Sequence, residues 1–221
     1  MIQRVYEQAA RSTALSRLVV ATDDARIYNH VSSFGGEVVM TELHHASGTD
    51  RCYDALKQLP GAYQYVINIQ GDEPFIDPAQ IDELAAALHD GLTQLATQMI
   101  PVHSHEMLFD KGEVKIVLNS NHEALYFSRM VIPFVKGFAE QEWHMHHPYY
   151  RHVGMYAYRT DVLEQLVKLP VSPLEQAESL EQLRWLEAGF KIKCIPTTYE
   201  SHCIDTPEDL ERVLRLTGNA L

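Results

Sequence analysis

Two carboxylates directly follow a short apolar run in residues 65–74 (YVINIQGDEP). The run is rich in β-branched side chains, which predicts a strand buried on both faces. Gly71 permits a turn, and Pro74 lacks the N–H that a central strand needs. Asp72 and Glu73 are therefore expected just beyond the carboxyl end of a strand, where open α/β sheets bind ligands. The alternative is that Asp72 only hydrogen-bonds within the turn.

A second carboxylate, Asp205, lies between the apolar run at residues 190–195 and the predicted last helix. Thr206 precedes a proline, and Asp209 follows Thr206 by three residues, which is a helix-capping pattern. This pattern leaves Asp205 free for another role. Because the carboxyl ends of parallel strands meet at one edge of a sheet, Asp72 and Asp205 are expected to lie close together.

Residues 41–51 (TELHHASGTDR) predict a loop that runs into a helix, with Ser47, Gly48 and Thr49 at the helix entrance. Backbone N–H groups at a helix N-terminus have no partner within the helix, so this entrance could bind carbonyl or phosphate oxygens. The alternative is that Thr49 or Asp50 only caps the helix.

Two further segments could line a pocket. Residues 151–159 (RHVGMYAYR) alternate and predict a strand, with His152 and Tyr156 on a polar, aromatic face suited to a sugar. A long helix is predicted over residues 173–188, where Glu178 and Gln182 would share one stripe with Glu175. A solvated charged face is the alternative for that stripe.

The elements that must position these residues alternate between helix and strand. Helices are predicted for the first dozen residues and at about 23–34, 50–59 and 77–89, and strands at 18–21, 38–40, 65–69, 97–100 and 190–195. Apolar and polar side chains alternate in residues 113–118 and 124–127, and turn residues lie between the two runs. This pattern predicts a hairpin. The pattern predicts one α/β domain over residues 1–221, with a mostly parallel sheet flanked by helices and a hairpin lobe at 119–158.

Composition excludes several classes of protein. The formal net charge is −12, whereas nucleic-acid binding needs clustered Lys and Arg. A nucleotide bridged by Mg²⁺ to carboxylates is still compatible with this charge. No apolar run approaches the roughly 20 residues that span a bilayer, and no secretory signal is visible. Cys52, Cys194 and Cys203 are an odd number without close spacing, which favours reduced thiols in a cytoplasm.

The segment from Ala124 to Tyr150 is rich in large apolar side chains outside any convincing helix or parallel strand, namely Phe127, Ile132, Phe134, Phe138 and Trp143. Exposed aromatic residues at this density are expected to bury themselves against a second copy of the chain. The histidines of residues 143–147 (WHMHH) could bind a metal, but a polar loop or interface is expected because no carboxylate pattern accompanies them.

Six stretches of the chain, in order, resemble the bacterial 3-deoxy-manno-octulosonate cytidylyltransferases, or CMP-Kdo synthetases: TELHHASGTDR, INIQGDEP, YFSR, RHVGMYAYR, SPLEQAESLEQLR and IDTPEDLE. The resemblance implies a Rossmann-related, nucleotide-diphospho-sugar transferase-like fold. It also implies transfer of CMP from CTP to the anomeric hydroxyl of 3-deoxy-D-manno-octulosonate (Kdo), which gives CMP-Kdo and pyrophosphate for lipopolysaccharide biosynthesis. The family works as a cytoplasmic homodimer with Mg²⁺.

The family's site residues carry over to matching positions of this sequence. The resemblance implies that Asp72 and Asp205 bind the metal and act in catalysis. Because both follow strands and Mg²⁺ binds oxygen at about 2.1 Å, their carboxylates are expected no more than roughly 5 to 6 Å apart. It implies that Ser47, Gly48, Thr49 and Arg51 contact cytidine. The implied Kdo-facing set is Gln70, Arg129, His152, Tyr156, Glu178 and Gln182.

One part of the family pattern has no counterpart in the sequence. Family members begin with a strand and a basic loop of the form PARxxSxRxPGKxL that holds the triphosphate, whereas residue 1 here matches the helix after that loop. The sequence therefore predicts weak triphosphate binding and impaired activity for residues 1–221. The alternatives are an enzyme like CMP-sialic acid synthetase, or a catalytically impaired dimer that binds a sugar or nucleotide.

Overall fold

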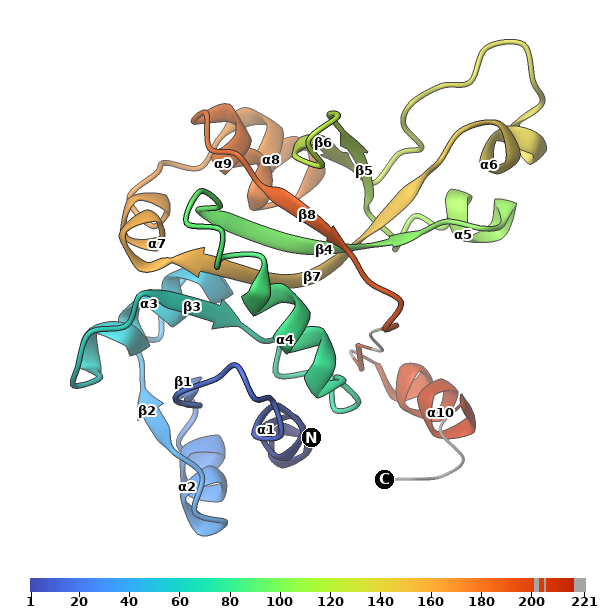
Figure 1. Ribbon diagram of the computed structural model, residues 1–221. Coiled ribbons are helices and arrows are strands. Elements are labelled where there is room, and N and C mark those ends of the chain that lie inside the picture. Colours follow the sequence, from blue (N-terminus) through green and yellow to red (C-terminus); the bar gives the residue numbers. More distant parts are fainter. Residues whose placement is uncertain (201–202, 205, 217–221) are drawn as a thin grey trace. The chain divides into compact units, whose positions relative to one another are not determined.

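The computed structural model describes residues 1–200, 203–204 and 206–216 (Figure 1). The chain divides into two compact units, which are described separately. The first unit comprises Met1–Gly61, Asn68–Asp82 and the chain from Tyr199 onward, and the second comprises Ala62–Ile67 and Glu83–Thr198. The hairpin lobe predicted at residues 119–158 falls within the second unit. No helix in the described ranges is long and apolar enough to cross a membrane.

The first unit contains a short parallel strand pair and helices, several of which begin at side-chain caps. Its elements are α1 (Ile2–Ala9), β1 (Val20–Thr22), α2 (Ala25–Ser33), β2 (Val38–Met40), α3 (Gly48–Gln58) and α10 (Pro207–Leu216). β1 pairs in parallel with β2. Asp24 caps α2 by accepting from the backbone N–H of Arg26, and Thr206 and Asp209 cap α10 reciprocally, as predicted.

The second unit is built on a six-stranded sheet. Its strands are β3 (Tyr65–Asn68), β4 (Leu95–Pro101), β5 (Lys115–Leu118), β6 (Ala124–Ser128), β7 (Tyr150–Arg159) and β8 (Lys193–Pro196). The order is β6-β5-β7-β4-β8, and β3 also pairs with β7. α4 (Pro78–Ala86) and β3 each run across the boundary between the two units.

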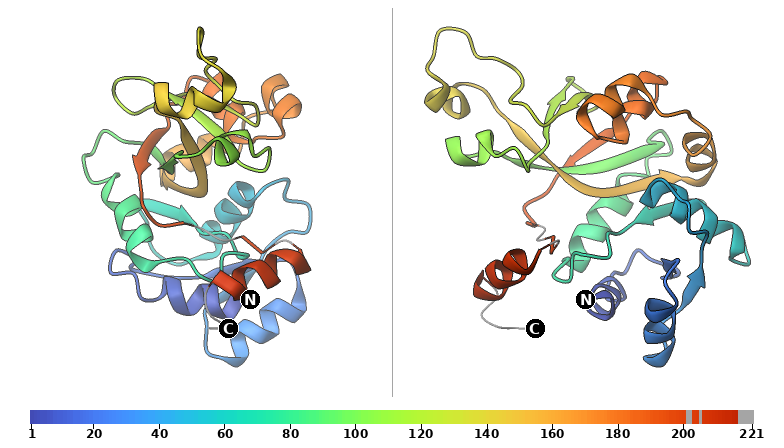
Figure 2. Two further views of the ribbon diagram at one scale, coloured as in Figure 1. Left: turned by 90° about the vertical axis from the view of Figure 1, so that its right-hand side faces the viewer. Right: turned by 180° about the vertical axis from the view of Figure 1, so that it is seen from behind.

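The sheet is more mixed than the sequence predicted. β4 and β8 are parallel, but β7 runs antiparallel to both β4 and β5, and β5 and β6 form the predicted antiparallel hairpin. Figures 1 and 2 show β7 as a long twisted strand of this sheet. The α/β fold class is confirmed. The β5–β6 pair is antiparallel because a short turn joins the two strands, and a hairpin turn can connect only antiparallel neighbours.

β4 provides the core of the second unit. All its residues from Leu95 to Ile100 are buried, as expected for a strand covered on both faces. Two of these buried residues are polar, Thr97 and Gln98, and each is 0% exposed. Buried polar groups need specific partners, and the Thr97 hydroxyl finds them in the backbone carbonyls of β7.

The long helix predicted over residues 173–188 is wrong. The segment forms two short helices, α8 (Pro173–Glu178) and α9 (Gln182–Glu187), which are separated at Ser179, where φ is +54°. A left-handed residue ends a helix, so Glu178 and Gln182 do not share one helical stripe. Glu175 instead forms a largely buried ion pair with Arg184, with 2.6 Å between Oε1 and Nη2.

The remaining segments of the second unit are α5 (His105–Phe109), the 3₁₀ helix Glu140–Glu142, α6 (Trp143–His146) and α7 (Thr160–Leu166). Trp143 packs with Val102, Leu108 and Tyr149 in a small core, and Phe127 is fully buried. The prediction that these two aromatic residues are buried against a second copy of the chain is therefore wrong, because they pack within their own unit. Phe134 and Phe138 are exposed, as predicted. All three cysteines are free thiols, also as predicted.

Candidate functional site

The entrance of α3 is preorganised in the first unit. Ser47, rather than Thr49 or Asp50, is the capping residue: its Oγ accepts from the backbone N–H of Asp50 at 3.2 Å. Thr49 is buried, and a Cβ added at Gly48 would lie 3.2 Å from the side-chain nitrogen of Asn68. The glycine thus allows the helix entrance to lie against Asn68 at the end of β3.

Arg51 is held rigidly beside this entrance. Its guanidinium donates to Thr41 Oγ1 at 2.7 Å and to Asp23 Oδ2 at 2.9 Å. Asp23 offsets part of the positive charge, and the two bonds fix the direction of the planar group. Residues predicted to contact cytidine therefore lie together at one helix N-terminus, where backbone N–H groups favour an anionic or carbonyl ligand.

Asp72 lies beside the segment that leads to Asp205. Its backbone carbonyl accepts from the N–H of Ile204 at 3.0 Å, and its Oδ2 accepts from the thiol of Cys203 at 3.1 Å. Asp205 itself lies outside the described residues, so the predicted distance between the two carboxylates stays a prediction. The two residues that precede Asp205 nevertheless lie against Asp72.

The second oxygen of Asp72 is unusual. Oδ1 is buried and has no hydrogen-bond partner within the described part of the chain. A buried carboxylate oxygen without a donor is costly, and a hard cation is a suitable partner for it. Among the described residues no group of three or more His, Cys, Asp or Glu side chains could hold a metal, so Asp72 would need further ligands.

Four side chains of the second unit form a cluster that we call the β7 cluster: Thr97, His152, Tyr156 and Trp185. The ring centroids of His152 and Tyr156 are 5.2 Å apart, and those of Tyr156 and Trp185 are 5.0 Å apart. His152 Nε2 lies 2.9 Å from Thr97 Oγ1. The alternation of β7 predicted the two residues of the strand, and β4 and α9 supply the other two.

Burial controls the protonation of this cluster. Residue His152 is partly exposed, but the loss of water around its ring lowers the pKa of the ring to about 3. The ring is therefore neutral at neutral pH. Burial also raises the pKa of Tyr156 well above its usual value, so the phenol keeps its proton. The Tyr156 hydroxyl and the Trp185 Nε1 group are both buried without a hydrogen-bond partner in the described structure. Two such groups beside a neutral imidazole suit a polyhydroxylated ligand.

Arg129 and Glu178 connect β6 to the end of α8. Glu178 accepts from the Ser128 hydroxyl at 2.6 Å and from the Arg129 backbone N–H at 3.0 Å, and Arg129 Nε donates to the Glu178 carbonyl at 2.9 Å. These two predicted Kdo-facing residues therefore support each other. Gln182 is buried at the start of α9 in the same unit, whereas Gln70 is partly buried in the first unit.

Sequence reasoning missed Thr97, Trp185, Asn68 and Cys203. A signal for Thr97 was present, because Thr97 and Gln98 interrupt an otherwise apolar strand. Trp185 carried no such signal, since an aromatic residue on a helix usually indicates core packing. Its role depends on the break at Ser179, which the helical periodicity did not predict.

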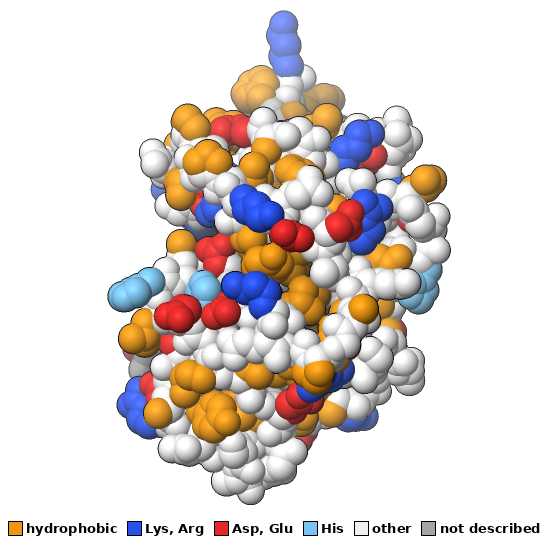
Figure 3. All heavy atoms as spheres, turned by 90° about the vertical axis from the view of Figure 1, so that its left-hand side faces the viewer, with side chains coloured by type: hydrophobic (Ala, Val, Ile, Leu, Met, Phe, Trp, Pro, Cys, Tyr) orange, Lys and Arg blue, Asp and Glu red, His pale blue; other side chains and the backbone are white. Residues whose placement is uncertain are grey.

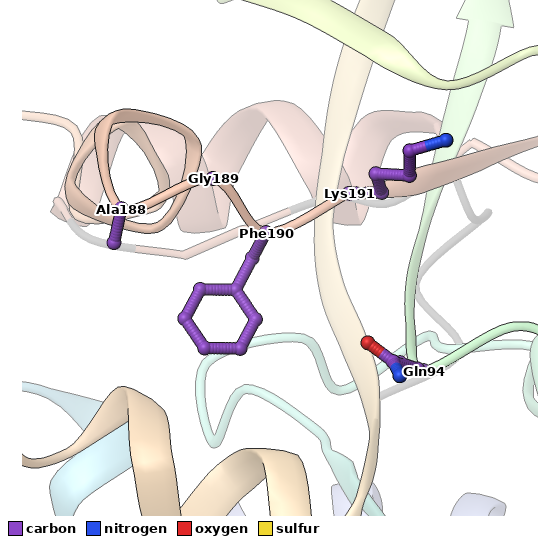
Figure 4. A pocket seen from close by; sticks show the side chains of 5 residues that line it. All are labelled: Gln94, Ala188, Gly189, Phe190 and Lys191. Atoms are coloured by element: carbon purple, nitrogen blue, oxygen red, sulfur yellow. The ribbon is translucent and has the colours of Figure 1, made fainter.

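A cavity of about 250 Å³ lies elsewhere in the second unit (Figure 4). Its lining is Gln94, Ala188, Gly189, Phe190 and Lys191. In Figure 4 the side chains of Phe190 and Lys191 extend in different directions, and Lys191 Nζ binds Glu123 Oε1 at 3.2 Å. No predicted site residue lines this cavity, so it is not the candidate site.

Charge is interspersed on the surface. On the face shown in Figure 3, basic and acidic side chains alternate with apolar ones, and no continuous basic patch is seen there. This distribution agrees with the net charge of −12. It suits a small ligand at a local site better than a nucleic-acid backbone.

Comparisons with known proteins match nearly the whole chain. A family model described as Cytidylyltransferase matches residues 1–192. The 3-deoxy-manno-octulosonate cytidylyltransferase of Parabacteroides distasonis is 51% identical over 223 residues, which is 99% of this chain and 88% of that protein. The enzyme of the same name from Bacteroides thetaiotaomicron is 51% identical over 222 residues, with the same shares covered. The solved structure of a CMP:2-keto-3-deoxy-manno-octonic acid synthetase complexed with CTP has a TM-score of 0.90 and 38% identity, and the match covers 100% of this chain and 88% of that one.

Proposed function

Because the chain belongs to the cytidylyltransferase family, we propose that it transfers CMP from CTP to the anomeric hydroxyl of Kdo and releases pyrophosphate. The product, CMP-Kdo, would serve lipopolysaccharide biosynthesis in the cytoplasm. The identity to Kdo cytidylyltransferases along 99% of the chain supports this substrate pair. The structural observation that carries the proposal is the buried, unpartnered Tyr156 hydroxyl beside the neutral His152 ring, a polar site for a sugar.

The entrance of α3 would bind the nucleotide. Ser47, Gly48 and Thr49 present backbone N–H groups at the helix N-terminus, and Arg51 adds a positioned cation. Selection of cytosine requires contacts to its carbonyl and ring nitrogen, which N–H donors can supply. A titration of CTP against this chain tests nucleotide binding at this helix entrance.

Mg²⁺ would bind at Asp72 together with Asp205. The unpartnered Oδ1 of Asp72 fits a hard cation that prefers carboxylate oxygens. Such an ion, when bound, supplies charge that stabilises the phosphate oxygens during transfer. The protein's part is to hold Asp72 oriented by its contacts with residues 203–204.

The β7 cluster would bind the acid sugar. His152 and Tyr156 would contact sugar hydroxyls, with Gln182 of the same unit as a further amide group. A role for Gln70 stays a prediction of the resemblance. Arg129 and Glu178, which bond to each other, would hold the adjoining backbone in place. Burial keeps both His152 and Tyr156 uncharged, so they orient hydroxyls rather than neutralise the carboxylate.

The test is pyrophosphate release from CTP with Kdo or N-acetylneuraminate, each with and without Mg²⁺. We expect turnover only with Kdo and Mg²⁺. The Asp72→Asn variant should lose roughly a hundredfold or more in rate, as is typical when a group that stabilises phosphoryl charge is removed. The control is Asp90→Asn, because Asp90 accepts hydrogen bonds from Leu92 and Thr93 in a surface turn. Preference for N-acetylneuraminate, or full activity of Asp72→Asn, would contradict the proposal.

A homodimer completes the proposal. Met130, Phe134, Phe138 and Met145 expose large apolar side chains in one segment of the second unit. Apolar residues gathered in this way are typical of protein interfaces. The partner would be a second copy of the chain.

A further inference from the structure

The Thr97 hydroxyl makes more close contacts than one proton can serve. Its Oγ1 lies 2.9 Å from His152 Nε2, 2.9 Å from the Met155 carbonyl oxygen and 3.1 Å from the Val153 carbonyl oxygen. Thr97 is 0% exposed, so water does not supply alternative partners. The three neighbours therefore decide where each hydrogen lies.

The strand pairing explains why two carbonyl groups meet one side chain. The register of β4 with β7 shifts between Thr97 and Gln98: Thr97 pairs with Tyr156, whereas Gln98 pairs with Val153. β7 thus carries two extra residues opposite this point, which is a bulge. At this bulge the Thr97 hydroxyl lies within hydrogen-bond distance of the carbonyl oxygens of both Val153 and Met155.

The two carbonyl oxygens can only accept a hydrogen bond, so the hydroxyl proton belongs to one of them. A hydroxyl proton directed instead at His152 would leave both carbonyl oxygens facing the Thr97 lone pairs at 2.9 and 3.1 Å. The favourable arrangement has the ring N–H donate to Thr97 Oγ1. Since the ring is neutral, it carries one hydrogen, and that hydrogen is on Nε2.

We propose that Thr97 is a positioning residue that holds His152 in the Nε2–H tautomer, so that Nδ1 presents a lone pair to a substrate hydroxyl. A sugar hydroxyl that meets Nδ1 must then donate its own proton, which specifies both the orientation of that hydroxyl and the class of ligand. This inference rests on the proposed function only for the identity of the sugar. The tautomer itself is a property of the free protein.

The test measures the tautomer directly by long-range ¹H–¹⁵N correlation NMR of protein labelled at histidine. The chain has 12 histidines, and the His152 signals are identified by their loss in His152→Gln. We expect wild-type His152 to show a protonated Nε2 and an unprotonated Nδ1 at pH 7. Protonation at Nδ1 in the wild type would overturn the proposal without any appeal to variants.

Variants then test the role of the hydroxyl. Thr97→Val should produce a mixture of tautomers and raise the KM for Kdo about tenfold, the effect of one lost hydrogen bond, while the KM for CTP stays unchanged. Thr97→Ser should restore the wild-type pattern. The matched control is Thr197→Val, which removes another buried hydroxyl of the same unit, bonded to Glu83 at 2.9 Å.

A single Nε2–H tautomer in Thr97→Val, or a Thr97→Ser protein that behaves like Thr97→Val, would overturn the assignment. If Thr97→Val does not fold, the wild-type tautomer and the Thr97→Ser result still decide it. Absence of Kdo turnover with the Nε2–H tautomer intact would contradict the proposed function and not this inference.

Discussion

At the scale of single residues, the β7 cluster contains two groups whose burial does not stabilise the folded protein. His152 is kept neutral, and the Tyr156 hydroxyl has no hydrogen-bond partner in the described structure. The unpartnered hydroxyl costs free energy in the absence of ligand, and the neutral ring lowers stability once the pH falls below the usual histidine pKa. Such costs at neighbouring positions are typical of a binding site rather than a packed core.

Tyr156→Phe should therefore separate stability from function. Removing a buried hydroxyl that lacks a partner should leave the free energy of unfolding unchanged or raise it by about 1 kcal/mol. The KM for Kdo should rise. Urea unfolding and steady-state kinetics measure the two effects.

The control for Tyr156→Phe is Tyr149→Phe. The Tyr149 hydroxyl donates to the Pro133 carbonyl at 2.5 Å, so its removal should cost about 1 kcal/mol of stability without changing the KM for Kdo. If Tyr156→Phe destabilises as much as Tyr149→Phe, then the hydroxyl has a structural partner and our assignment fails.

His152 should also make stability depend on pH. Its pKa is about 3 in the folded protein, against a usual value of 6.5. As the pH falls below the usual value, the unfolded chain binds a proton that the folded protein does not, so stability decreases between about pH 6.5 and pH 3, by up to about 1.4 kcal/mol per pH unit. Above this window the residue contributes no slope.

The measurement is urea unfolding of wild type and His152→Gln from pH 7.5 to pH 4.5. The variant should show a shallower loss of stability, while His44→Gln, which replaces an exposed histidine, should follow the wild type. Identical slopes for wild type and His152→Gln would mean that His152 takes up a proton in the folded protein.

At the scale of elements, the break between α8 and α9 decides how the sugar-side residues are presented. Ser179 adopts φ +54°, which side-chain-bearing residues avoid. The Arg129 guanidinium donates to the carbonyls of Glu178 and Ser179, where the end of a helix favours a cation. Because the helix breaks here, α9 starts in a new direction, and its Trp185 packs against Tyr156.

Ser179→Gly should stabilise the protein by about 0.5 to 1 kcal/mol, because glycine adopts the left-handed conformation without the steric cost. Ala177→Gly is the matched control: it lies in the same helix at an exposed position and should destabilise by about 1 kcal/mol. Both are read from urea unfolding midpoints. Equal destabilisation by the two glycines would show that the Ser179 side chain is needed at the break.

At the scale of the whole molecule, the proposed homodimer gives the exposed apolar side chains a partner. Phe134 is 71% exposed, and it lies in the segment that also exposes Met130, Phe138 and Met145. Sedimentation at micromolar concentration should show a dimer. Phe134→Asp should weaken association by about 2 kcal/mol or more, as expected for an aromatic residue at the centre of an interface.

Leu92→Asp is the control for Phe134→Asp, since Leu92 is 84% exposed and lies in the turn before β4. It should leave the dimer intact. A monomeric wild type, or equal effects of the two substitutions, would exclude this segment as the interface.

The sequence by itself determined the α/β class, the cap of α10 and the β5–β6 hairpin. It also placed Asp72 after a strand and His152 and Tyr156 within one. These features depend on near neighbours in the chain, such as a capping side chain two or three residues away or a two-residue alternation. The six ordered stretches were also sufficient for the family, which the comparisons confirm.

Only the tertiary structure decided which of these residues meet. Thr97 contacts His152 across 55 residues of chain, through a bulge that no local pattern predicts. The helix breaks at Ser179 although the sequence pattern there is helical. Phe127 and Trp143 are buried within their own unit. The physical reason is the same in each case: side-chain direction follows from strand register and helix ends, and packing between distant segments sets both.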